Sequence, residues 1–144
     1  MATKTNATTK LTTPTLLFLK TPKEVGRESD RMLSDVRTIR DRMLGVRGKR
    51  TVANTLVPFN ELSNLISLVA LQNQLLFNAH TNAAVRDAAN KAYLAADSMA
   101  TEISLDRPLY DAFVSLDVRH ADAETRFAVS KILRDFRRAG VDRD

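Results

Sequence analysis

The sequence predicts an all-α protein of about five helices in an antiparallel array, and three observations lead to this fold class. The 144 residues include only four glycines and four prolines, too few turn residues for a fold of many short strands. Apolar residues recur at helical spacings of three and four along most of the chain. Strand-like alternation never extends beyond four residues. With 44% hydrophobic and 27% charged residues, the chain can form one core.

The helices are placed by their capping residues. Thr21, followed by Pro22 and Glu24, forms a capping box that starts the first helix. Asn82, Asp106 and Asp122 are N-caps of the last three helices, and the fifth is expected to stop at a left-handed Gly140. Gly45 and Gly48 end the first helix. The five helices are expected at about residues 22–46, 51–80, 83–103, 107–116 and 123–139.

The second helix is expected to be central. It is apolar around much of its circumference, and Pro58 fits only in its first turn, where a missing N–H is tolerated. Four companions, two of them short, are too few to cover it, so the isolated chain is expected to expose apolar surface and to self-associate or be marginally stable. The apolar residues expected on the four longer helices are Val25, Met32, Val36, Ile39 and Met43; Leu62, Leu65, Ile66, Leu68, Val69, Leu71, Leu75 and Leu76; Val85, Ala88, Ala89, Ala92, Ala96, Met99 and Ile103; and Phe127, Val129, Leu133 and Phe136.

Ahead of the helices, residues 1–17 are expected to form a disordered, threonine-rich lead, and residues 18–144 one helical segment. Residues 1–15 hold seven threonines and no acidic residue. A transit peptide would carry arginines, and the apolar run between Pro14 and Lys20 is too short for a secretory signal. No stretch is long and apolar enough to cross a bilayer. A cytoplasmic protein without a membrane partner is therefore expected.

Residues suited to catalysis are scarce. Cysteine is absent, and H-E-x-x-H and phosphate-binding glycine motifs are missing. His80 and His120, the only histidines, are interpreted as a helix-end residue and a loop residue rather than metal ligands. The clustered acids are interpreted as caps, first-turn residues and surface partners, as Asp111 is for Arg107. We therefore assign no catalytic, cofactor-binding or metal-binding residue. The clustered acids are Asp106, Asp111, Asp117, Asp122 and Glu124.

Positive charge is concentrated near the N-terminus. The net charge is +5, and residues 1–50 hold 12 basic and five acidic residues. Basic side chains also cluster around the first interhelical loop and at the end of the last helix. A stand-alone basic module that binds nucleic acid or an acidic partner is one hypothesis, although nucleic acid is disfavoured because Phe136 is the only aromatic residue among these charges. The two clusters are Arg42, Arg47, Lys49 and Arg50, and Lys131, Arg134, Arg137 and Arg138.

Three segments together resemble the N-terminal helical region of the thimet oligopeptidase-like family of zinc metallopeptidases. They are Arg50–Phe59 (RTVANTLVPF), Leu105–Phe113 (LDRPLYDAF) and Leu133–Val141 (LRDFRRAGV), and Thr21–Val25 is similar to the opening helix of that family. The likeness keeps the order and spacing of the segments and covers about residues 18–144.

The resemblance implies the channel-wall portion of a larger all-helical enzyme that cleaves short peptides. In that family the H-E-x-x-H helix and a third glutamate ligand lie beyond the matched region, so zinc is implied only for the complete protein. The expected partners are then peptides or the catalytic part of the same protein. Because the chain of the family continues beyond the matched region, the resemblance leaves two interpretations open. This chain is either the N-terminal portion of a longer oligopeptidase, with truncation at residue 144 as the simpler account, or a truncated relative that keeps the helices and has lost the chemistry.

Overall fold

The computed structural model describes residues 17–18 and 20–143, and in these residues it is helical without strands, as the sequence predicts. Residues 1–16 of the expected lead lie outside the described residues. The elements are α1 (Pro22–Leu44), the π-helix η2 (Val52–Leu56), α2 (Val57–Ala79), α3 (Ala83–Ser104), α4 (Arg107–Val114) and α5 (Ala123–Ala139).

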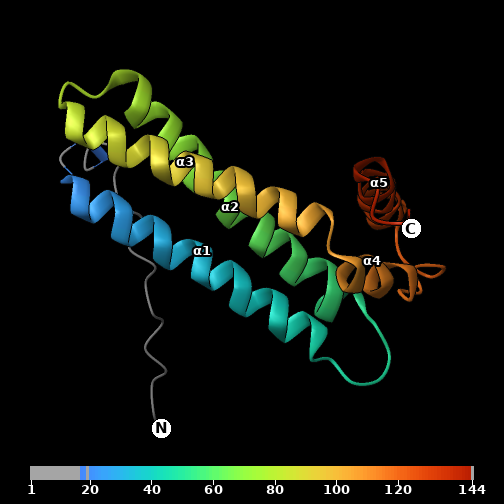
Figure 1. Ribbon diagram of the computed structural model, residues 1–144. Coiled ribbons are helices and arrows are strands. Elements are labelled where there is room, and N and C mark those ends of the chain that lie inside the picture. Colours follow the sequence, from blue (N-terminus) through green and yellow to red (C-terminus); the bar gives the residue numbers. More distant parts are fainter. Residues whose placement is uncertain (1–16, 19, 144) are drawn as a thin grey trace, which may run out of the picture.

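Three long helices, α1, α2 and α3, lie side by side and make up most of the molecule (Figure 1). The chain reverses direction from each long helix to the next, so α2 runs antiparallel to both α1 and α3. The short α4 and then α5 gather at the end of this unit where α3 ends. All three long helices contact one another, and α2 keeps one open side on which Leu68, Leu71 and Leu75 are exposed.

The capping residues act as the sequence predicts. The Thr21 hydroxyl accepts a hydrogen bond from the Glu24 N–H, and the Glu24 carboxylate accepts one from the Thr21 N–H at 2.8 Å. The side chains of Asn82, Asp106 and Asp122 each accept from N–H groups of the next turn. At the other end of α5, Gly140 adopts the left-handed conformation with φ 98°. These contacts satisfy N–H groups that a helix start leaves without a partner.

The second helix does not begin as a regular α-helix. Residues 52–56 form a π-helix, in which the Val57 N–H donates to the Val52 carbonyl five residues earlier. Pro58 explains the wider turn, because its ring crowds the carbonyl of Asn54 and it has no N–H to donate. Thr51 caps the π-helix together with Asn54, as the sequence reading of a start near residues 51–54 requires.

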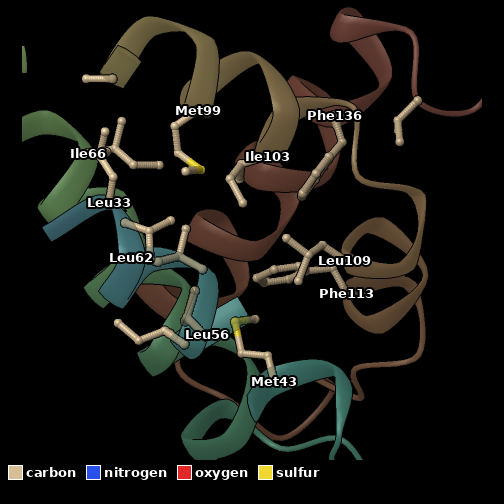
Figure 2. Packing of buried hydrophobic residues seen from close by; sticks show 14 of the residues in the cluster. Leu33, Met43, Leu56, Leu62, Ile66, Met99, Ile103, Leu109, Phe113 and Phe136 are labelled. Atoms are coloured by element: carbon tan, nitrogen blue, oxygen red, sulfur yellow. The ribbon is translucent and has the colours of Figure 1, made fainter. Parts of the chain in front are cut away.

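The main core lies between the three long helices and the inner faces of α4 and α5 (Figure 2). Most of the apolar positions expected on the helices are buried or pack against this core; Met32 is half-buried beside the buried Leu33. Phe127 is 67% exposed and lies on the outer face of α5. A second, smaller cluster lies at the other end of the long helices and contains Val25, Leu76, Val85 and Ala89.

One polar pair is buried between α1 and α2. The Asn73 amide donates to the Ser29 hydroxyl at 3.0 Å and to the Val69 carbonyl at 2.8 Å. Both side chains are almost fully buried, at 3% and 5% exposure. Both helices thus bring a polar side chain into a mostly apolar interface, and the two satisfy each other.

Candidate functional site

The three segments that carry the family resemblance come together in space. The ring of Phe59 packs edge-on against Phe113 with 4.9 Å between the centroids, and lies 5.8 Å from Phe136. Phe113 and Phe136 are 6.2 Å apart, and Tyr110 stands at 6.0 Å from Phe136. The aromatic cluster, which consists of Phe59, Tyr110, Phe113 and Phe136, therefore joins the start of α2 to the helices α4 and α5. Figure 2 shows Phe113 and Phe136 of this cluster.

An apolar groove of about 280 Å³ lies beside the aromatic cluster, between α2, α3 and α5. Its lining is mostly apolar, with three serines and Asp135 as the polar residues. The apolar lining residues are Phe59, Ile66, Ala100, Ile103, Ile132 and Phe136. These serines have no histidine among the lining residues to act as a general base, so the groove is suited to holding an apolar side chain rather than to nucleophilic chemistry.

An ion pair fixes α4 against α1 close to this cluster. The Arg40 guanidinium donates to one carboxylate oxygen of Asp106, while the other oxygen accepts from the Leu109 N–H at 3.0 Å and caps α4. The Asp106 side chain is 7% exposed. The hydrogen bond to Asp106 raises the pKa of Arg40 above its ordinary value. Asp106 is thus a helix cap, as predicted, and also the partner of a residue 66 positions away.

Neither histidine is placed to bind a metal. Nε2 of His80 lies 3.0 Å from the Phe18 carbonyl, and its Nδ1 accepts from the Asn82 N–H at 3.0 Å. The ring also stacks on Phe18, so His80 joins the start of the described chain to the α2–α3 turn. His120 lies in the exposed turn before α5. Within residues 17–18 and 20–143, no three histidine, aspartate or glutamate side chains form a group that could hold a metal ion.

The clustered acids have separate structural roles. Asp111 pairs with Arg107 one turn earlier, at 2.9 Å, as predicted. Asp117 accepts from the Arg119 guanidinium at 2.9 and 3.0 Å, and this contact holds the pKa of Asp117 well below its usual range. The Thr125 N–H lowers the pKa of the Asp122 cap in the same way. Asp111, Asp117 and Asp122 thus each have a cap or ion-pair partner of their own.

The two basic clusters differ in how they are paired. Near the first loop, Arg42 pairs with Glu61 at 3.3 Å and Arg50 donates to the Met43 carbonyl at 2.6 Å. On α5, Arg137 donates to the Tyr110 hydroxyl at 3.3 Å. The other three basic residues of this cluster lie with an exposed aromatic side chain on one outward stripe, at spacings of four, three and four, and one of them, Arg134, lies 3.7 Å from the Asp135 carboxylate. This basic stripe consists of Phe127, Lys131, Arg134 and Arg138.

The open side of α2 carries a row of exposed leucines. Leu68, Leu71 and Leu75 are 42%, 65% and 48% exposed, and their spacing of three and four places them on one stripe. Their exposure confirms that the helices of this chain leave apolar surface uncovered. We refer to these three residues as the leucine stripe.

Comparison with known proteins gives no relative. No protein family, no curated protein and no solved structure matches the chain. Separately, none of the helices in the described part of the chain is long and apolar enough to span a membrane.

Proposed function

We propose that this chain is the N-terminal helical part of a zinc-dependent oligopeptidase, where it forms a wall of the channel that admits short peptides. The observation that carries the proposal is the aromatic cluster. The segments 50–59, 105–113 and 133–141 resemble one family as an ordered set, and they contribute Phe59, Phe113 and Phe136 to a single packing unit. Segments that were inherited together as parts of one fold are expected to keep such contacts. Segments that resemble the family only by chance have no reason to lie in contact.

The role we propose is structural, because the residues described here do not fit a zinc site. The His80 ring is held by Phe18 and Asn82, and no group of three suitable side chains forms in the described residues. Zinc binding and peptide cleavage are assigned to a part of the protein outside this sequence. What these residues contribute is a packed set of helices, and a wall of this kind limits access to unfolded or short substrates.

The coding DNA and the native protein test this proposal. We expect the reading frame to continue beyond codon 144 into an H-E-x-x-H helix and a downstream glutamate-bearing helix. Antibodies against this chain should then deplete peptide-cleaving activity from the source, and a zinc chelator should abolish the activity that they capture. A stop codon after residue 144, with an intact native mass of 16.1 kDa, would overturn the proposal.

A second candidate, binding of nucleic acid or another polyanion, is favoured by the basic stripe on α5. Lys131 and Arg138 lie with Arg134 on one outward face beside the exposed Phe127, a combination that suits phosphates and stacked bases. If this is the function, a single-stranded oligonucleotide should bind, and its affinity should fall steeply with salt as counterions are released.

Two matched triple variants test this second candidate, and each removes three positive charges from one helix. Replacing Lys131, Arg134 and Arg138 by glutamine should abolish binding, while replacing Lys23, Arg27 and Arg31 of α1 should leave most of it. Equal losses in both triple variants would mean that only net charge matters, and no binding at low salt would eliminate this candidate.

A further inference from the structure

The helix α2 is unusually poor in charge for a helix with an open side. Its 23 residues include one charged residue, Glu61, whose carboxylate pairs with Arg42 of α1. The equally long α1 contains eleven charged residues. A helix face in contact with water is normally rich in charged side chains. The open side of α2 therefore has the composition of a contact surface.

The exposed residues on this side follow a seven-residue repeat. The leucine stripe continues in both directions through Asn64 and Asn78, at alternating spacings of four and three, and all five residues are exposed. This is the spacing with which two helices pack side chains along a common seam. Along its length α2 packs against α1 and α3, and its first turn also meets α4 and α5 through Phe59, whereas the leucine stripe stays exposed.

We propose that the leucine stripe binds the same stripe of a second copy of this chain, with the two α2 helices antiparallel. In this register Leu68 lies opposite Leu71 of the second copy, Asn64 opposite Leu75, and Glu61 opposite Asn78. The seam then contains no like charges. Parallel pairing would instead bring the two Glu61 carboxylates together and align the two helix dipoles, both of which are unfavourable.

The size of the surface sets the strength of this contact. The seam from Glu61 to Asn78 spans about 25 Å at 1.5 Å per residue, and a helix face is about 10 Å wide. The projected area of about 250 Å² is well below the roughly 800 Å² per partner of a stable interface. We therefore expect a weak, reversible dimer rather than a permanent one.

Sedimentation equilibrium of the 144-residue chain tests the dimer. The average mass should rise with concentration between about 10 µM and 1 mM. Leu71→Glu and Leu68→Lys should each stay monomeric, and an equimolar mixture should recover association because the two new charges lie opposite each other. The control is Leu94→Glu, which changes an equally exposed leucine on α3 and should leave association unchanged. Circular dichroism confirms that each variant is folded.

Chemical cross-linking tests the antiparallel register. The chain has no cysteine, so a short bismaleimide reacts only at introduced thiols. A mixture of Leu68→Cys and Leu71→Cys should yield mixed cross-linked dimers in clear excess over those of either variant alone. An excess of self-linked dimers with either single variant would overturn the antiparallel register. If the chain stays monomeric at 1 mM, for example because another part of the chain covers α2, the proposal is wrong. It is also wrong if Leu71→Glu dimerises as strongly as the unchanged chain. These outcomes do not depend on the proposed function.

Discussion

At the scale of single residues, Asp106 combines two tasks that helix caps usually perform separately. One carboxylate oxygen caps α4 and the other receives the Arg40 guanidinium, and the side chain is nearly buried. Asp122 caps α5 in an exposed position and has no ion pair among the described residues, so it shows the effect of a cap alone. Comparing the two carboxylates separates the contribution of the ion pair.

We predict that Asp106→Ala lowers the free energy of unfolding by about 2 kcal/mol, since it removes a cap and leaves Arg40 without its main partner. Asp122→Ala should have a clearly smaller effect. Urea denaturation followed by circular dichroism measures both. Equal losses in the two variants would show that the Arg40 contact adds nothing.

Two glycines give opposite predictions for the same substitution. Gly140 has φ 98°, a conformation in which a side chain is strained, so Gly140→Ala should cost about 1 kcal/mol. Gly26 lies inside α1, with nothing within 4 Å of an added methyl group, so Gly26→Ala should stabilise by up to about 1 kcal/mol. Thermal melting of the two variants measures both effects. If the two melting temperatures shifted in the same direction, the backbone conformation assigned to one of the two glycines would be wrong.

At the scale of elements, α5 packs on the rest of the molecule through two buried side chains, Val129 and Phe136, of which Phe136 is the larger. Phe136 is buried in the aromatic cluster, while Phe127, on the same helix, points outward. Phe136→Ala should therefore cost about 3 to 5 kcal/mol, and Phe127→Ala should change stability little. The free energy of unfolding from urea titration distinguishes the two, and a comparable loss from Phe127→Ala would refute the orientation of α5.

The sequence predicted the helices well because their signals are local. Caps such as Thr21 and Asp122 act on the next turn, so the residues that cause a boundary lie beside it. The π-helix was missed because Pro58 was judged by its missing N–H alone, and not by the crowding of its ring against an earlier carbonyl. The outward turn of Phe127 was missed because a neighbouring stripe of α5 supplies the buried residues.

The candidate site could be predicted only in part. The likeness of three segments was visible in the sequence, but their contact through Phe59, Phe113 and Phe136 depends on how α4 and α5 fold back on α2. Similarly, Asp106 was identified as a cap, whereas its partner Arg40 is 66 residues away. Long-range contacts of this kind leave no local pattern, so they were accessible only from the structure.

At the scale of the whole molecule, the carboxyl groups predict how stability depends on pH. Hydrogen bonds lower the pKa values of three carboxyl groups. Glu24 is bound to Thr21, Asp117 to Arg119, and Asp122 to the Thr125 N–H. Because each pKa is lower in the folded chain, the unfolded chain binds more protons as the pH falls below the ordinary carboxyl values near 4. The stabilisation is complete above those values and is lost as the pH falls through the lowered ones.

The urea midpoint should therefore be steady from pH 7 to about 5 and should fall between about pH 4.5 and 2.5. The variant with Glu24→Gln, Asp117→Asn and Asp122→Asn should start from a lower midpoint at pH 7 and lose less on acidification. If the native chain and the variant showed the same acid-induced loss, these three groups would not be its source.

The buried contact between Asn73 and Ser29 has a consequence for the alignment of α1 and α2. Sliding one helix along the other by one turn, about 5.4 Å, would replace Ser29 by Val25 or Leu33. The amide would then be buried against an apolar side chain, losing a hydrogen bond at a cost of about 1 to 3 kcal/mol. Leucine and valine side chains tolerate such slippage, but this amide does not. A single hydrogen-bonded pair thus selects one longitudinal position for two 23-residue helices.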